Sequence, residues 1–246
     1  MSKSVAAIIC AAGPGTRFGG KRKKQFTDVG GRAVFVRSIE LFANRDRVKQ
    51  ILLGISPEDE EIVTVKWGAN LKFFGVRIFF GGSERFDTVI EGLKLLADDV
   101  DLVAVHDACR CCATDKLIDD IIAAAAQTGA AIPASPVVAT LKEAKDGVIT
   151  RTVDRANLFE AQTPQVFETS LLKKAYANLG NLDRAQVTDD AFLVEALGHE
   201  VSVVESDASN LKITKPGDIP IAEAVIKGRP KLKPEGPIGP YIEAQW

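Results

Sequence analysis

The chain has 246 residues, 46% of them hydrophobic, and its 31 Lys and Arg nearly balance its 33 Asp and Glu. This length suits one large α/β domain or two small ones, and the apolar content excludes disorder of the whole chain. The near-neutral charge gives no reason to expect nucleic acid as a partner, and no apolar run reaches the roughly 18–20 residues that a membrane span needs. Four cysteines do not make a disulfide framework, so we expect a cytoplasmic protein.

Short apolar runs alternate with segments of helical periodicity along the chain. The apolar runs predict strands over residues 5–10, 50–55, 76–80, 102–106, 130–134 and 201–205. Helical spacing of apolar residues recurs within 35–42, 89–96 and 117–125. Ser56, followed by Pro57 and two acidic residues, is typical of a helix N-cap. This alternation indicates βαβ units and therefore an α/β fold with a mostly parallel central sheet.

Residues 135–160 interrupt this alternation. Two extended segments flank Asp146-Gly147, which is a strong signal for a β-hairpin. We interpret the stretch as an arm inserted into a single domain that covers residues 1–227. Residues 228–246 hold four of the eleven prolines and show little periodicity, so we interpret them as a C-terminal tail.

The predicted first strand leads into a Gly-rich basic loop, where Gly13 and Gly15 would let backbone N–H groups approach a phosphate chain. The loop departs from the dinucleotide fingerprint because Phe18 takes the place of the third glycine. It departs from the P-loop because Arg22 stands where a Ser or Thr would hold Mg²⁺. The position after the first strand favours a polyphosphate site over an ordinary solvated loop. The loop carries five cations within eight residues: Arg17, Lys21, Arg22, Lys23 and Lys24.

Two other segments are placed to contribute to a site. Asp107 follows the strand predicted over 102–106, at the end where α/β sheets bind ligands. It could bind Mg²⁺ through one carboxylate while phosphates supply the other ligands, or it could be a turn or cap residue. Residues 81–88 (Gly81 to Thr88) lie between a strand and a helix, where two glycines and hydroxyl groups suit a sugar or base contact. Helix capping explains that segment nearly as well.

The chain has only two histidines, His106 and His199. A His-centred nucleophilic triad could use only His106, and no Gly-x-Ser-x-Gly elbow accompanies it. His106 also stands near Cys109, Cys111 and Cys112, but their spacing does not match ordinary structural zinc sites, so we expect free thiols and no zinc. These observations favour a reaction with little proton transfer, such as nucleotidyl transfer to a nucleophile that is already an anion.

The segment from Ala11 to Arg17, followed by Lys24-Gln25-Phe26, resembles the signature loop of the 2-C-methyl-D-erythritol 4-phosphate cytidylyltransferases of the non-mevalonate isoprenoid pathway. Further landmarks of that family follow in order within residues 5–222. They are Gly81-Gly82 with Arg85 and Thr88, residues 105–108 with Arg110, residues 153–155, 161–165 and 188–190, and residues 210–214 with Pro216 and Asp218. The resemblance implies a three-layer Rossmann-like nucleotidyltransferase with an inserted β-hairpin dimerisation arm.

The same resemblance implies a reaction. CMP would pass from CTP to 2-C-methyl-D-erythritol 4-phosphate, giving 4-diphosphocytidyl-2-C-methyl-D-erythritol and pyrophosphate, with Mg²⁺ as cofactor. Ribitol-5-phosphate cytidylyltransferases share much of the motif set, so ribitol 5-phosphate remains an alternative acceptor. Two rivals belong to other classes. An NAD-binding oxidoreductase is disfavoured by the broken fingerprint, and a non-catalytic nucleotide-binding regulator is disfavoured because the charged residues of the family site are present.

The family site can be carried over residue by residue. Arg17 and Lys24 resemble the two catalytic cations on the triphosphate, and Asp107 resembles the Mg²⁺-associated aspartate. Lys23 takes the place of a usual proline, which leaves open whether Lys23 or Lys24 points inward; the following Gln25 favours Lys24. The implied CTP contacts are Ala11, Ala12, Gly13, Gly82, Ser83, Thr88 and Asp107. The implied acceptor contacts are Arg110, Thr140, Arg155, Thr163, Thr188 and Lys212. The family is a homodimer in which the arm reaches toward the partner's site.

Overall fold

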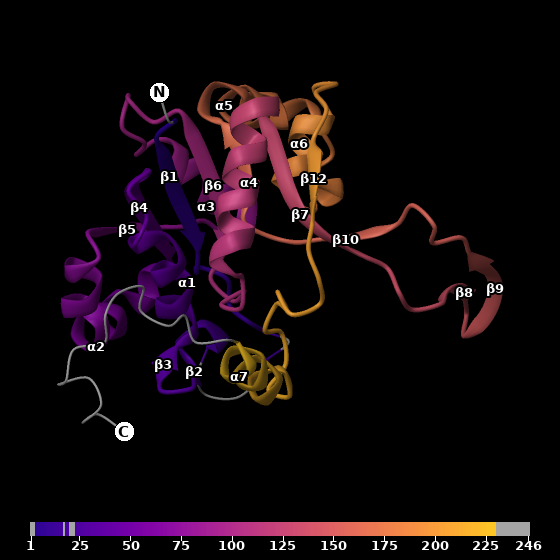
Figure 1. Ribbon diagram of the computed structural model, residues 1–246, viewed down its shortest axis with the longest axis horizontal. Coiled ribbons are helices and arrows are strands. Elements are labelled where there is room, and N and C mark those ends of the chain that lie inside the picture. The colour runs from indigo at the N-terminus through magenta and orange to yellow at the C-terminus, as the bar shows by residue number, and fades with distance from the viewer. Residues whose placement is uncertain (1–2, 17, 20–22, 230–246) are drawn as a thin grey trace, which may run out of the picture.

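The computed structural model describes residues 3–16, 18–19 and 23–229, and its core is one large twisted sheet with helices on both faces (Figure 1). The strands of this sheet are β1 (Val5–Cys10), β4 (Val48–Ile55), β5 (Val76–Phe80), β6 (Leu102–Asp107), β7 (Ala130–Pro136), β10 (Phe159–Ala161), β11 (Gln165–Glu168) and β12 (Ser202–Glu205). Their order is β10-β7-β11-β6-β1-β4-β5, with β12 beside β7.

The sheet is mostly parallel, as the sequence predicts. Strand β1 pairs in parallel with β4 and β6, β4 with β5, and β12 with β7. The exceptions are β11, which runs antiparallel between β6 and β7, and β10, which is antiparallel to β7. All six predicted strands are present. The two antiparallel strands were not predicted, because runs of three or four residues are too short to show a period.

The two faces of the sheet are each covered by helices, because successive side chains of a strand point to opposite faces. Val5, Ala7 and Ile9 of β1 join the core cluster on one face, and Ala6 and Ile8 join the other. The first face packs against α1 (Val34–Ala43), α2 (Glu60–Phe73) and α4 (Asp115–Thr128). The second face packs against α3 (Arg85–Leu93), α5 (Thr169–Ala177) and α6 (Asp190–Glu195). This is the expected three-layer arrangement.

Two helix boundaries differ from the prediction. Ser56 stands at the N-cap position, but its side chain makes no capping hydrogen bond, and a 3-10 turn, η2 (Pro57–Asp59), precedes α2. The helix expected over residues 89–96 is α3, which begins at Arg85 and ends at Leu93. It begins earlier than the apolar spacing indicates because Glu84 and Asp87 form a reciprocal capping box.

The predicted hairpin is present, and Figure 1 shows it projecting from the body. Strands β8 (Leu141–Lys145) and β9 (Val148–Val153) pair in antiparallel fashion, off the main sheet. They are joined by Asp146 and Gly147, whose φ angles are 52° and 80°. Both residues are left-handed, which matches the Asp-Gly turn that the sequence indicates.

A smaller group of elements lies at the end of the sheet where β1 and β6 finish. Helix α7 (Asp218–Gly228) packs near β2 (Asp28–Val29), which pairs with β3 (Arg32–Ala33). Short 3-10 turns complete the chain: η1 (Lys24–Phe26), η3 (Asn178–Asn181) and η4 (Arg184–Gln186). Most of the C-terminal tail interpreted at 228–246 lies outside the described residues. Within the described part of the chain, no helix is both long enough and apolar enough to cross a membrane.

Candidate active site

A pocket opens at the carboxyl ends of β1 and β6, where Cys10 and Asp107 are paired in register. Ligands of α/β sheets bind at this edge. Nine of the residues assigned to the site from the sequence line the pocket: Ala11, Ala12, Gly13, Lys24, Gly82, Ser83, Thr88, Asp107 and Lys212.

Lys24, rather than Lys23, lies at the pocket. Lys24 opens the turn η1 and lines the pocket, whereas the Nζ of Lys23 pairs with Glu58 and lies 2.9 Å from Oδ2 of Asp59. Gln25 explains why the turn sits so close to the loop: its Nε2 donates to the carbonyl oxygens of Ala11 and Gly13, at 2.9 and 3.2 Å. The structure thus agrees with the register that Gln25 favours.

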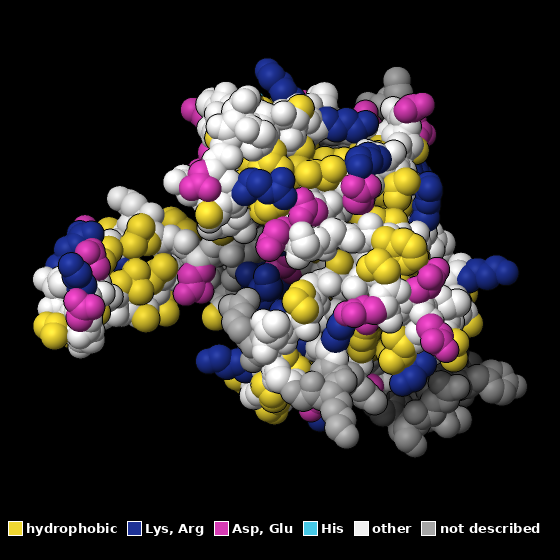
Figure 2. All heavy atoms as spheres, turned by 180° about the vertical axis from the view of Figure 1, so that it is seen from behind, with side chains coloured by type: hydrophobic (Ala, Val, Ile, Leu, Met, Phe, Trp, Pro, Cys, Tyr) yellow, Lys and Arg dark blue, Asp and Glu magenta, His cyan; other side chains and the backbone are white. Residues whose placement is uncertain are grey.

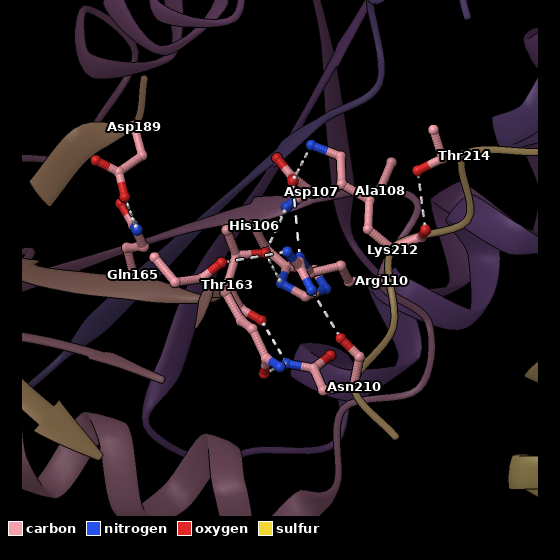
Figure 3. Close-up of polar contacts among 12 residues, drawn as sticks. His106, Asp107, Ala108, Arg110, Thr163, Gln165, Asp189, Asn210, Lys212 and Thr214 are labelled. Carbon is pink, nitrogen blue, oxygen red and sulfur yellow. Dashed lines mark hydrogen bonds and ion pairs between the residues drawn. The ribbon is translucent and has the colours of Figure 1, made fainter. Parts of the chain in front are cut away.

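Asp107 is surrounded by cations (Figure 3). Its Oδ1 accepts from Nε of Arg85 at 2.9 Å, and its Oδ2 lies 2.6 Å from Nζ of Lys212 and 3.9 Å from Nε of Arg110. Burial alone raises the pKa of Asp107, but the charges and hydrogen bonds of Arg85 and Lys212 outweigh burial and hold that pKa well below its usual range. The carboxylate is therefore ionised at neutral pH and directed toward the pocket rather than used as a helix cap.

Arg85 extends this charge cluster into the interior. Its Nη1 lies 2.7 Å from Oδ2 of Asp190, a fully buried carboxylate at the start of α6. The hydroxyl of Tyr176 donates to the other oxygen of Asp190 at 2.5 Å, and Oε1 of Gln165 accepts the backbone N–H of Asp190 at 3.0 Å. The chain Tyr176–Asp190–Arg85–Asp107 thus connects α5, α6 and α3 to the pocket.

Arg85, Asp190 and Gln165 were noted in the family motifs, but no role was assigned to them. Arg85 and Asp190 are 105 positions apart along the chain, and no spacing rule connects them. The only sequence signals are an arginine directly after a Gly-rich turn and two adjacent aspartates at 189–190. Neither signal shows that the side chains meet.

Thr163 and His106 support Asp107 from behind. Oγ1 of Thr163 accepts the backbone N–H of Asp107 at 3.0 Å and pairs with Nδ1 of His106 at 3.0 Å (Figure 3). His106 is fully buried against Phe42, and burial lowers its pKa to about 3. The imidazole is therefore neutral and is not placed to act as a base in the pocket.

The Gly81–Thr88 segment both caps a helix and contributes to the lining of the pocket. Glu84 and Asp87 cap α3, so capping accounts for part of the motif. The two glycines are required by packing, because a Cβ at Gly81 would lie 2.5 Å from Oγ1 of Thr88, and one at Gly82 would lie 2.3 Å from Cβ of Asp87. Gly82 and Thr88 nevertheless line the pocket, where a base or sugar would contact them.

Other assigned residues lie outside the pocket. Arg110 is beside it, donating to the carbonyl oxygen of Asn210 at 2.7 Å. Thr188 is exposed in the loop before α6. Thr140 and Arg155 are exposed on the arm, where Arg155 donates to the carbonyl oxygen of Val138. Arg17 lies outside the described residues.

The thiols near the pocket are free and protonated. All four cysteines are unpaired, and burial raises the pKa of Cys10 to about 12 and that of Cys109 to about 11. Cys111 and Cys112 are buried beneath α7. Among the residues that the structure describes, no group of three or more His, Cys, Asp or Glu side chains is placed to hold a metal ion. That zinc is absent from the purified protein stays a prediction.

Comparison with known proteins identifies the family. The family model described as 2-C-methyl-D-erythritol 4-phosphate cytidylyltransferase matches residues 5–228. The protein of that name from Endomicrobium trichonymphae is 42% identical over 90% of this chain and 98% of its own length. Its counterpart from Rhodopirellula baltica is 41% identical over 91% and 95%.

Solved structures agree with the sequence comparison. A 4-diphosphocytidyl-2C-methyl-D-erythritol synthase from Anaerococcus prevotii superposes with a TM-score of 0.78 at 29% identity, covering 92% of this chain and 97% of that one. The Thermus thermophilus 2-C-methyl-D-erythritol 4-phosphate cytidylyltransferase gives a TM-score of 0.73 at 31% identity over 92% and 100%. The match extends through the arm, the pocket and α7, and the chain therefore belongs to the 2-C-methyl-D-erythritol 4-phosphate cytidylyltransferase family.

Proposed function

We propose that this protein transfers CMP from CTP to 2-C-methyl-D-erythritol 4-phosphate, giving 4-diphosphocytidyl-2-C-methyl-D-erythritol and pyrophosphate. Family membership supports the overall reaction. The structural observation that carries it is the composition of one pocket, in which Lys24, Lys212 and the ionised Asp107 meet a Gly-rich loop. Such a pocket binds phosphates and stabilises the charge that moves between them.

The residues of the pocket suit an in-line displacement. A phosphate oxygen of the acceptor forms a bond to the α-phosphorus of CTP, and the bond from that phosphorus to the pyrophosphate oxygen breaks. A phosphate monoester is largely a dianion at neutral pH, since its second pKa is about 6, so no general base is required. The buried, neutral His106 fits this requirement. Lys24, which lines the pocket, would stabilise the negative charge that grows on the leaving pyrophosphate.

Mg²⁺ is the proposed cofactor, and the residues present fit it. Asp107 offers an ionised carboxylate at the mouth of the pocket, and Mg²⁺ is commonly held by one or two carboxylates while substrate phosphates supply further ligands. When bound, the ion would neutralise charge on the triphosphate. In this structure Oδ1 of Asp107 pairs with Arg85 and Oδ2 pairs with Lys212.

We also propose a homodimer formed through the arm. Figure 2 shows hydrophobic side chains gathered over the arm, on a surface that faces solvent in the single chain. These exposed residues are Val138, Val148, Ile149, Leu158 and Phe159. A two-stranded hairpin is marginal by itself, so a partner surface would stabilise it. The same contact would bring Thr140 and Arg155 to a neighbouring subunit's pocket.

A cytoplasmic location is the remaining part of the proposal. The support is chemical: all four thiols are free, and three of them are buried. Free cysteines persist in reducing compartments. Fractionation of the producing cells, with the protein detected by antibody, tests this directly.

The reaction is tested by measuring pyrophosphate release from each nucleoside triphosphate with each candidate acceptor. We expect turnover with CTP and methylerythritol phosphate, and loss of turnover in excess EDTA that returns with Mg²⁺ or Mn²⁺. Equal turnover of ribitol 5-phosphate would move the assignment to the related acceptor. Undiminished turnover in EDTA would remove the metal from the proposal without affecting the transfer.

A further inference from the structure

Lys23 is not among the residues that line the pocket at the ends of β1 and β6. Its side chain instead forms ion pairs with another part of the chain. Its Nζ pairs with Glu58 and Asp59 on the turn η2. Lys23 and Asp59 are 36 positions apart in the sequence. The side chain of Asp59 is only 8% exposed and that of Lys23 is 22% exposed. An ion pair at this depth is less screened by solvent than a surface pair.

The backbone of Lys23 sets the start of the turn that carries Lys24. Its carbonyl oxygen accepts from the N–H of Phe26 at 3.1 Å, which closes η1. Its φ and ψ are −64° and 142°. Any movement of residue 23 would therefore be transmitted to residue 24 through the next peptide bond.

The neighbours of Lys24 are anchored in different directions. Gln25 donates to the loop carbonyls of Ala11 and Gly13. Phe26 stacks on Trp67 with ring centroids 5.6 Å apart and meets Phe35 edge-on. Lys23 anchors the N-terminal side of the same turn, and Lys24 is the cation of this group that lines the pocket.

We propose that Lys23 is a positioning residue for Lys24. Its ion pairs with Asp59 and Glu58 hold the backbone before Lys24 so that the Lys24 ammonium stays at the leaving pyrophosphate. The charge of Lys23 acts on η2 and not on the triphosphate. This inference rests on the proposed function, because it gives Lys24 a role in that reaction.

The backbone angles supply a way to separate positioning from charge. Proline fixes φ near −65°, the value that Lys23 already has. Lys23→Pro would therefore replace the ion pair with a covalent restraint on the same backbone and remove the charge. Lys23→Met removes the charge without restraint, and Asp59→Asn removes a partner while keeping the cation.

The experiment compares these three variants with Glu60→Gln, a matched loss of one acidic charge at an exposed neighbouring position. We expect Lys23→Met and Asp59→Asn each to lower kcat by about tenfold, with a smaller change in KM for CTP, because a displaced catalytic group costs rate more than binding. The double variant, Lys23→Met with Asp59→Asn, should be no slower than either single variant. Lys23→Pro and Glu60→Gln should stay within about threefold of the parent.

Three outcomes would overturn the proposal. A slow Lys23→Met beside a normal Asp59→Asn would show that Lys23 acts directly on the triphosphate. Normal rates for both would show that Lys24 needs no such anchor. A Lys23→Pro protein as slow as Lys23→Met, with unchanged thermal stability, would show that the backbone restraint is not what matters.

A second measurement does not depend on turnover. The bonds after Lys23 and Lys24 are tryptic sites, and mass spectrometry can follow their cleavage in the protein without substrate. We expect Asp59→Asn to be cut at these two bonds several times faster than Glu60→Gln, because local opening of η1 is then easier. Equal cleavage would contradict the anchor. If the parent protein released no pyrophosphate, the proposed function would fail while this assay still tested the ion pair.

Discussion

The cations at the pocket lie around one anionic residue, Asp107, and on the Gly-rich loop. Lys24 lines the pocket from the loop, and its neighbours Gln25 and Phe26 hold it there. Lys212 approaches the same pocket from the segment between β12 and α7, where its ammonium pairs with Asp107. The two lysines thus reach the pocket from opposite ends of the sequence. This arrangement would allow each lysine to contact a different substrate.

Lys24→Ala should lower kcat by about 10²–10³-fold and raise KM for CTP far less, because the lost contact stabilises charge that grows only in the transition state. Steady-state pyrophosphate release at saturating CTP measures this. Lys116→Ala is the control, since Lys116 is an exposed lysine on α4. Arg17→Ala is expected to behave like Lys24→Ala. A mild Lys24→Ala beside a severe Lys23→Ala would mean that the other lysine is the catalytic one.

His106 predicts a pH dependence of stability. Burial lowers its pKa from 6.5 to about 3, so the unfolded chain binds a proton that the folded chain excludes. Stability is therefore fully present above pH 6.5 and is lost as the pH falls toward 3, by up to about 1.4 kcal/mol per pH unit. Urea unfolding between pH 7.5 and 4.5 measures this. His106→Gln should flatten the slope, and an unchanged slope would assign it to another group.

At the same scale, the sequence could predict the residues that carry their own local pattern. The basic loop and Asp107 were found because each follows a predicted strand, and parallel strands bring their carboxyl ends together. The Arg85–Asp190 pair could not be found in this way, because the contact depends on how α3 and α6 pack on one face of the sheet. Thr163 was assigned by resemblance as an acceptor contact, and in the structure its hydroxyl oxygen accepts the backbone N–H of Asp107.

At the scale of elements, one buried polar chain joins α5, α6, α3 and β6. Asp190 lies at the centre of these contacts and is fully buried. It is also the first residue of α6, and its backbone N–H donates to Oε1 of Gln165. Such a charge is costly to bury unless every partner is in place. The chain therefore makes the position of Asp107 depend on the docking of three helices.

Asp190→Ala should lower the free energy of unfolding by about 3 kcal/mol, since it leaves the Arg85 guanidinium with one fewer anion in a buried site. Asp98→Ala, at an exposed position, should change it by less than about 0.5 kcal/mol. Chemical denaturation followed by circular dichroism compares the two. Equal, small effects would show that Tyr176 and Arg85 find other partners and that the chain contributes little.

The elements that were predicted and those that were missed differ in length and surroundings. Strand β1 and residues 102–105 of β6 are apolar throughout because they are buried on both faces, and that pattern is visible in the sequence. Strand β11 is equally buried but has only four residues, and its antiparallel direction follows from where the chain returns after the arm. The hairpin was predicted because Asp146-Gly147 encodes its turn locally.

At the scale of the whole molecule, a single chain leaves its proposed acceptor site divided. Lys212 lines the pocket and Arg110 lies beside it, while Thr140 and Arg155 stand on a projecting arm with an exposed apolar surface. A two-fold interface would let each arm serve the other subunit's pocket, because such an interface exchanges equivalent contacts. The sequence could indicate the arm but not its destination, since no local pattern encodes which subunit a loop contacts.

Arg155 is therefore predicted to act in trans to Lys24. The test combines two inactive variants, Lys24→Ala and Arg155→Ala, by co-expression or refolding, with hybrid dimers proven by two affinity tags. In a hybrid with exchanged arms, one pocket collects both lesions and the other collects none. Random mixing makes half of the dimers hybrid, so about one quarter of all sites should recover. If Arg155 acted on its own subunit's pocket, every site would keep one lesion, and a mixture of proven hybrids would be as inactive as its parents.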